Sequence, residues 1–195
     1  MSDFFKEHSF NMVKLFLNQI VMSVFGIMLW MAVLANKPVL LAASIFSVLF
    51  YLFINYSALW ELGAKDKIRV DAGRLAAMPQ KGIYIALGAA VPNVILTLLI
   101  GIGVVIDTAA SQSVGTICNV IVRLINGMYL GIIDCTKAAV FEGTPLLSDI
   151  WWWYFIINIP ALFVGWLAYF LGSKNIRIGA FFGIKQKANT GTKKH

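Results

Sequence analysis

The feature that most constrains this chain is a series of apolar runs, each long enough to cross a lipid bilayer. A membrane-spanning helix needs about 20 mostly apolar residues. Four runs meet that length, at residues 15–35, 39–60, 83–106 and 151–171. Because hydrocarbon offers no partner to unpaired backbone groups, spans of this length must be helical. The sequence therefore predicts an all-α, polytopic transmembrane helical bundle in a single domain, residues 1–195.

Charge supports this class of protein and excludes others. Charged residues make up 13% of the chain and hydrophobic residues 59%, whereas a soluble domain carries about 25% charged residues. The formal net charge is +7, but the Lys and Arg residues flank the apolar runs and do not form a separate basic domain. We therefore expect a lipid bilayer with anionic headgroups as the counter-charge, and no binding to nucleic acid.

The positions of the basic residues also predict an orientation. Cytoplasmic loops of membrane proteins carry an excess of Lys and Arg. With four spans and a cytoplasmic N-terminus, thirteen of the sixteen basic residues lie inside, in the N-terminal segment, the loop 61–81 and the tail 173–195. We therefore predict a multi-pass protein of the plasma (cytoplasmic) membrane with both termini in the cytoplasm.

One further segment, residues 115–133, is ambiguous. Its nine Leu, Ile and Val residues each favour insertion by about 0.3–0.6 kcal/mol, whereas an Arg at a helix centre opposes it by about 2.5–3.5 kcal/mol. Arg123, together with the amides of Asn119 and Asn126, roughly cancels the apolar side chains. If the segment crossed, the basic residues would divide eight inside to seven outside. Four spans are therefore favoured, with residues 107–150 as an interfacial helix or a re-entrant hairpin, and a fifth span is the alternative.

Drawn as one helix, this segment places its polar side chains on a single face. They lie within an arc of about 80° and comprise Gln112, Asn119, Arg123, Asn126, Asp134 and Lys137. The favoured interpretation is an amphipathic helix on the membrane surface with this stripe in water; the alternative is an inward stripe that lines a polar cavity or a subunit contact. Arg123 would then be the main binding residue, because a cation inside a membrane usually marks a functional site. The other candidate binding residues on the stripe are Asn119, Asn126 and Asp134.

Two other sets of polar residues are candidates for a binding site. In the second span, four polar residues recur on one helical face: Ser44, Ser47, Tyr51 and Asn55. Such a stripe avoids lipid, so it predicts which face of the span points into the bundle, and Tyr51 and Asn55 are its candidate binding residues. Asn93 follows Pro92 in the third span, and Asn158 precedes Pro160 in the last. Helix breaks at matching depth are typical of transporter binding sites.

The basic segments predict a contact surface for lipid headgroups or for a protein partner. Charges of both signs alternate along residues 61–81, which predicts a solvated, self-paired loop. The tail 173–195 combines Lys residues with Phe181 and Phe182, a mixture suited to the surface of an anionic membrane. The candidate contact residues are Lys65, Lys67, Arg69, Arg74, Lys174 and Arg177.

A short stretch of similar sequence ends the second and the last span. Residues 62–69 read LGAKDKIR and residues 171–177 read LGSKNIR, so they match with one gap. Like sequence at like depth indicates the same face of the membrane. Together with Trp60 and Glu61, which precede the first copy, these motifs resemble small bacterial integral membrane proteins that are themselves uncharacterised. The resemblance covers the short motifs and the general layout, and it implies neither an activity nor site residues.

The residues that membrane enzymes need are scarce, so we expect no catalytic activity, no cofactor and no metal. The two histidines, His8 and His195, both lie in the termini and form no metal-binding cluster. Cys118 and Cys135 are too widely spaced for a thiol motif. The sequence favours a non-catalytic subunit of a larger membrane complex with a role related to transport. The alternatives are a substrate-binding or pore-lining component of a small-molecule transporter and a membrane assembly or adaptor protein, bound to a protein partner or to a second copy of the chain.

Overall fold

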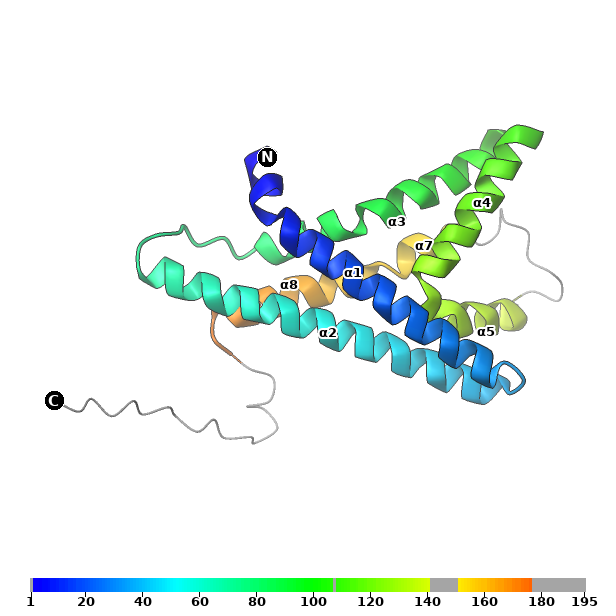
Figure 1. The fold of residues 1–195 in the computed structure, drawn as a ribbon, viewed down its shortest axis with the longest axis horizontal. Helices are drawn as coiled ribbons and strands as arrows, with labels where there is room; N and C mark the ends of the chain where they lie inside the picture. The colour runs from blue at the N-terminus through cyan, green and yellow to red at the C-terminus, as the bar shows by residue number, and fades with distance from the viewer. Residues whose placement is uncertain (1, 107, 141–150, 177–195) are drawn as a thin grey trace.

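Every regular element in the described part of the chain is a helix (Figure 1). The computed structural model describes residues 2–106, 108–140 and 151–176. Its elements, in chain order, are α1 (Ser2–Val33), α2 (Lys37–Asp71), α3 (Lys81–Ile106), α4 (Ala109–Ile125), the 3₁₀ turn η1 (Gly127–Tyr129), α5 (Leu130–Val140), α7 (Trp153–Ile156) and α8 (Ile159–Ser173). Four helical segments, with α7 and α8 counted as one, are long and apolar enough to cross a membrane. The prediction of an all-α bundle with four helices able to span a membrane and one further amphipathic, re-entrant or fifth-span helix is confirmed.

Each long segment runs in the opposite direction to the one before it, so the bundle has two ends (Figure 1). At the basic end α1 and α3 begin, and α2 and α8 finish. Contacts define this end, because Asp66 in α2 binds both Lys81 at the start of α3 and Tyr169 in α8. The turn end holds residues 34–36, which connect α1 to α2. Both ends of the described chain thus lie at the basic end, as expected for an even number of crossings.

Apolar side chains fill the bundle and also cover its outside. One buried cluster lies toward the basic end and includes Leu59 and Ile85, and a larger one lies toward the turn end and includes Val122. The outward faces are apolar as well, since Phe53 on α2 is 62% exposed and Phe163 on α8 is 57% exposed. Contiguous apolar surface of this extent is stable only against hydrocarbon or a partner.

α4 and α5 form a bent pair that enters the bundle and turns back. α4 begins beside the end of α3, where Ser111 donates a hydrogen bond to the backbone oxygen of Gly103. The pair bends by 83° at its break, and α5 then leads to Cys135, whose sulfur lies 3.7 Å from the backbone oxygen of Lys37. Gly103 and Lys37 both lie toward the turn end. Of the alternatives that the sequence leaves open, these contacts fit a re-entrant hairpin better than a fifth crossing.

The polar stripe was drawn on a single helix, but the structure interrupts that helix at residue 126. α4 stops at Ile125 because the side chain of Asn126 donates to the backbone oxygen of Val122 at 3.0 Å. The next residue, Gly127, then packs against α1, where a Cβ atom would lie 2.6 Å from the backbone oxygen of Ser23. Glycine therefore allows the tip of the hairpin to approach α1 more closely than any other residue would.

From Asn119 onward, the polar stripe of α4 faces the protein, and the opposite, apolar face is exposed. The exposed large side chains of α4 are Val114, Ile117, Val120, Ile121 and Leu124. Asn126 is buried, and Asn119 and Arg123 are partly buried. The favoured interpretation, a surface helix with its polar stripe in water, is therefore wrong. Amphipathicity shows that a helix has two different faces, but it does not show which face meets protein.

The charged segment after the second span is largely helical, which corrects the loop predicted at residues 61–81. α2 continues to Asp71, so only residues 72–80 connect it to α3. The helix persists because Asp66 and Lys81 are buried against each other instead of being solvated. α2 has 35 residues and is about 52 Å long, so it extends well beyond a hydrocarbon core of about 30 Å.

Candidate functional site

Four amide side chains from separate parts of the chain form one hydrogen-bonded row in the middle of the bundle. Gln19 in α1 donates to Asn126 at the hairpin tip (2.9 Å), and Asn126 donates to Asn93 in α3 (3.3 Å). Asn93 donates to Asn158 (3.3 Å), which in turn donates to the backbone oxygen of Tyr154 (2.6 Å). Each amide nitrogen thus donates to the next group, so all the hydrogen bonds of the row have the same direction. Asn126 and Asn93 are 1% and 0% exposed, so the centre of the row is shielded from its surroundings.

Helix ends and an internal proline place these amides. Asn93 follows Pro92 within the continuous helix α3, Asn158 lies between α7 and α8, and Asn126 ends α4. A helix end or an internal proline releases backbone groups that can recruit polar side chains into the interior. The prediction that the Asn–Pro positions of two spans lie at matching depth is confirmed, because Asn93 and Asn158 are hydrogen bonded to each other.

The sequence reasoning missed Gln19. Its side chain is 4% exposed although it lies within the first apolar run. Ser23, one turn later, donates to the backbone oxygen of Gln19 at 2.8 Å and also to that of Ile125 at the end of α4. The available signal was a pair of polar residues one helical turn apart inside a span, which predicts an inward face.

A second polar group lies between this row and the turn end. Arg123 in α4 pairs with Asp134 in α5 at 3.3 Å, and about a third of each side chain is exposed. Trp30 in α1 donates to the other oxygen of Asp134 at 2.9 Å. Nearby, Tyr154 donates to Asn119 at 2.6 Å. The structure therefore brings the predicted residues of α4 and α5 together, but Arg123 already has a partner and ties the two arms of the hairpin to each other.

The polar stripe of α2 faces the interior, as predicted, because all four of its residues are buried. Ser44 binds the hairpin tip: it donates to the backbone oxygen of Met128 at 2.7 Å and accepts from the backbone N–H of Ile132 at 3.3 Å. Tyr51 and Asn55 lie further toward the basic end and are 5% and 4% exposed. These two residues border a cavity.

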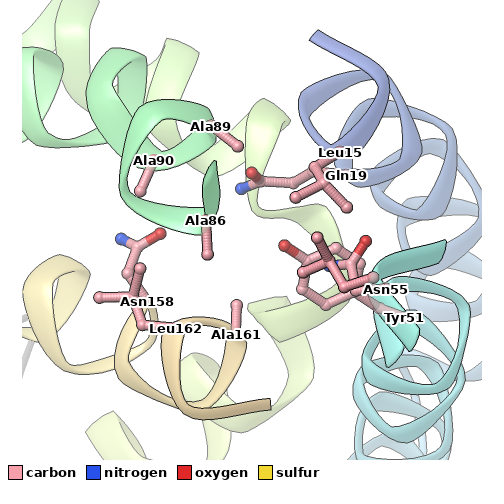
Figure 2. A pocket seen from close by; sticks show the side chains of 11 residues that line it. Leu15, Gln19, Tyr51, Asn55, Ala86, Ala89, Ala90, Asn158, Ala161 and Leu162 are labelled. Atoms are coloured by element: carbon pink, nitrogen blue, oxygen red, sulfur yellow. The ribbon is translucent and has the colours of Figure 1, made fainter. Parts of the chain in front are cut away.

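The cavity lies where α1, α2, α3 and the start of α8 meet (Figure 2). The residues that line it are Leu15, Gln19, Tyr51, Asn55, Leu59, Ala86, Ala89, Ala90, Asn158, Ala161 and Leu162. None of these side chains carries a charge. The centre of a water molecule can reach about 20 Å³ of the space, which is room for one or two water molecules.

Asn55 is the residue of this cavity that most needs an explanation. Its side-chain oxygen is buried and has no hydrogen-bond partner in the described part of the chain. Roughly 90% or more of buried polar groups are partnered, so an unpartnered amide oxygen beside an open space points to something that binds there. Figure 2 shows Gln19, Tyr51 and Asn55 grouped on one side of the space and Asn158 on the other.

Beyond the cavity, an ion pair closes the basic end. The Lys81 Nζ donates to the Asp66 carboxylate at 2.7 Å, and the two side chains are 6% and 2% exposed. Tyr169 donates to the same carboxylate oxygen at 3.0 Å. The sequence reasoning missed this pair because Asp66 and Lys81 stand among charged residues that are exposed, and nothing local distinguishes them.

The two similar segments at the ends of α2 and α8 lie against each other at this end. A Cβ atom on Gly63 would lie 2.9 Å from the backbone nitrogen of Ser173, and one on Gly172 would lie 3.1 Å from that of Ala64. The matching glycines therefore bring the two helix backbones into direct contact. The prediction that these segments share one face of the membrane agrees with their shared position in the bundle.

The predicted contact residues surround the same end on its outside. Those within the described residues are exposed, Lys67 less so than the others: Lys65, Lys67, Arg69, Arg74 and Lys174. Lys65 pairs with Glu61 one turn earlier at 2.7 Å. Arg177 lies outside the described residues. We call these exposed basic residues the basic collar.

Neither a metal site nor a known relative identifies the chemistry. Within residues 2–106, 108–140 and 151–176, no three His, Cys, Asp or Glu side chains are close enough to hold a metal ion. Cys118 and Cys135 are both free thiols. No protein-family model, curated protein or solved structure matches the chain.

Proposed function

We propose that the chain is a non-catalytic integral membrane component of a small-molecule transport system, and that it binds its solute in the cavity between α1, α2, α3 and α8. The buried, unpartnered oxygen of Asn55 carries this proposal. Leaving such a group unsatisfied costs about 1–3 kcal/mol, and proteins retain destabilising groups where function needs them. A bound solute would supply the missing partner.

The interrupted helices around the cavity support the same proposal. Asn158, which lines the cavity, lies at the break between α7 and α8. Gln19, which also lines the cavity, is hydrogen bonded to Asn126 at the tip of the hairpin. Transporters build their sites from interrupted helices near the middle of the membrane, and non-helical backbone at that depth is tolerated only where it is buried in protein or lines a cavity.

Filling the cavity tests the function. Ala90 lines the space and is 8% exposed, so the larger side chain of Ala90→Leu should occupy it. Wild-type protein in reconstituted vesicles should speed the entry of at least one solute from a panel of water, ammonia, urea and glycerol, and Ala90→Leu should return entry to the rate of empty vesicles. Phe53→Leu, on the lipid-facing side of α2, is the matched control. Equal rates for wild type and Ala90→Leu would refute the proposal.

In this proposal the basic end faces the cytoplasm, and its exposed Lys and Arg residues meet the anionic headgroups of the plasma membrane. The free thiols test the orientation. An impermeant maleimide added to intact cells should modify Cys135, which is partly exposed near the turn end, and should leave the buried Cys118 unmodified. Modification of Cys135 only after the cells are broken would reverse the orientation.

A second candidate function, a membrane assembly or adaptor subunit, is favoured by the basic collar. α2 carries Lys65 and Arg69 beyond the hydrocarbon core on a continuous helix, where a protein partner or a second copy of the chain could bind. Lys65→Glu combined with Arg69→Glu should then release a co-purified partner, whereas Ala90→Leu should not. Retention of every partner by the charge-reversed protein would exclude this function.

A further inference from the structure

The cavity offers an uneven set of free hydrogen-bonding groups. Asn158 is partly used, since its oxygen accepts from Asn93 and one of its two N–H groups donates to the backbone oxygen of Tyr154. Gln19 uses one N–H group, in the bond to Asn126. Its oxygen takes part in none of the hydrogen bonds of the amide row, and the residue lines the cavity.

α2 adds a second acceptor oxygen and a hydroxyl group. The oxygen of Asn55 is unpartnered within the described residues. Tyr51, one turn earlier, also lines the cavity. A phenol hydroxyl can donate one hydrogen bond, and each amide nitrogen carries two hydrogens. The cavity therefore presents acceptor oxygens together with hydrogen-bond donors.

Charge and size restrict the ligand further. No lining side chain is charged, and an ion transferred into such an interior without a counter-charge is strongly disfavoured. The space suits one or two water-sized groups. The ligand must therefore be neutral, very small, and able both to donate and to accept hydrogen bonds.

We infer that the cavity binds a neutral molecule of one or two non-hydrogen atoms that donates hydrogen bonds to Gln19 and Asn55 and accepts one from Tyr51. Water and ammonia share this chemistry. Urea is too large for the space, and ammonium has the wrong charge. The inference rests on the proposed function, because it names the class of solute for the same cavity.

Entry into vesicles is the first of two measurements on the full chain. Water entry is followed by light scattering and ammonia entry by a pH-sensitive dye inside the vesicles, so the probe that responds identifies the source of the ligand. We expect one of the two to enter faster than in empty vesicles, and urea to enter no faster. Asn55→Leu and Tyr51→Phe should each slow this entry about fivefold, the effect of one lost hydrogen bond. Phe53→Leu should leave it unchanged.

Binding is the second measurement, made by NMR on protein with ¹⁵N-labelled Asn and Gln side chains in detergent micelles. Ammonia at pH 9, where much of it is neutral, should shift the Asn55 amide signals, and the same total concentration at pH 6 should not. If water is the ligand, the Asn55 signals should instead show a cross-peak to water that Phe53→Leu retains. Tyr51→Phe, which removes a single hydroxyl, serves as the test variant if Asn55→Leu does not fold.

The outcomes separate the ligand class from the transport function. An Asn55 response to ammonia or water without any accelerated entry would support the ligand class and overturn transport. Suppose that urea or ammonium enters faster than in empty vesicles, and that Asn55→Leu and Tyr51→Phe do not change its rate. This result would support transport and overturn the ligand class. Asn55 signals that respond to neither probe, with both variants permeable at the wild-type rate, would also overturn the ligand class.

Discussion

The Asp66–Lys81 pair at the basic end and the Arg123–Asp134 pair near the turn end both join elements of the same bundle, yet the protein covers them to very different degrees. Asp66 and Lys81 are 2% and 6% exposed and lie 2.7 Å apart. Arg123 and Asp134 are 35% and 30% exposed and lie 3.3 Å apart. A charged side chain in the enclosed pair cannot replace its partner with water, whereas one in the partly exposed pair can.

This difference implies that the two ends of the bundle resist opening unequally. At the basic end, the enclosed pair is reinforced by Tyr169 and by the backbone contact of Gly63 with Gly172. Near the turn end, the hairpin is held by a pair that is about a third exposed and by individual hydrogen bonds from Ser44 and Trp30. If the cavity exchanges solute, we expect the hairpin side to move and the basic end to stay closed.

The largest expected effect comes from breaking the enclosed pair. Asp66→Ala leaves the Lys81 charge buried without a partner, so the free energy of unfolding should fall by about 3–5 kcal/mol, measured by thermal or denaturant unfolding in detergent. Arg69→Ala, which removes an exposed cation 3.8 Å from Asp66, is the control and should change little. The double variant Asp66→Leu/Lys81→Met should recover most of the loss, because two apolar side chains leave no charge unpaired.

Arg123→Ala should have a smaller effect, of about 1 kcal/mol or less, because water screens a pair that is about a third exposed. A double-mutant cycle with Asp134→Ala measures the coupling between the two side chains. This coupling should weaken as salt concentration rises, whereas that of Asp66 with Lys81 should not. A coupling for Arg123 that is equally large and equally insensitive to salt would remove the contrast between the two ends.

The smallest effect is expected at Lys65. Its bond to Glu61 is 2.7 Å long, but the two side chains are 65% and 58% exposed, and many surface pairs of this kind contribute nothing measurable to stability. Lys65→Ala should therefore leave the unfolding temperature unchanged at any salt concentration. A clear loss of stability would show that the collar is packed against something when the protein is in its membrane.

The spans could be predicted from sequence because the requirement that sets them is local. An apolar run of sufficient length must be helical in lipid whatever surrounds it. The inward face of α2 was also predictable, since Ser44 and Asn55 mark it with polar atoms that lipid cannot satisfy. The matching depth of Asn93 and Asn158 was also predictable from their prolines, whereas their hydrogen bond to each other was not predicted.

The rest depended on tertiary contacts that no local pattern encodes. Asp66 is buried only because α3 and α8 both meet α2 at this residue. In the sequence it stands among other charged residues of α2, so no local pattern distinguishes it from them. The stripe of α4 was recognised, but its direction was not, because protein amides and water satisfy polar side chains equally well. Asn55 was predicted as a binding residue from its place on the polar face of the second span. That its oxygen has no hydrogen-bond partner within the described residues could be learned only from the structure.

The contact between Gly63 and Gly172 has a consequence for biosynthesis. Gly63 is made early, but the residues that cover it belong to the last helix of the bundle. Chains emerge from the ribosome with the N-terminus first. The face of α2 around Gly63 therefore stays uncovered until α8 has been synthesised. A chain that stalls before α8 would thus display a bare backbone surface, which quality-control proteases and insertases could read as the mark of an unfinished protein.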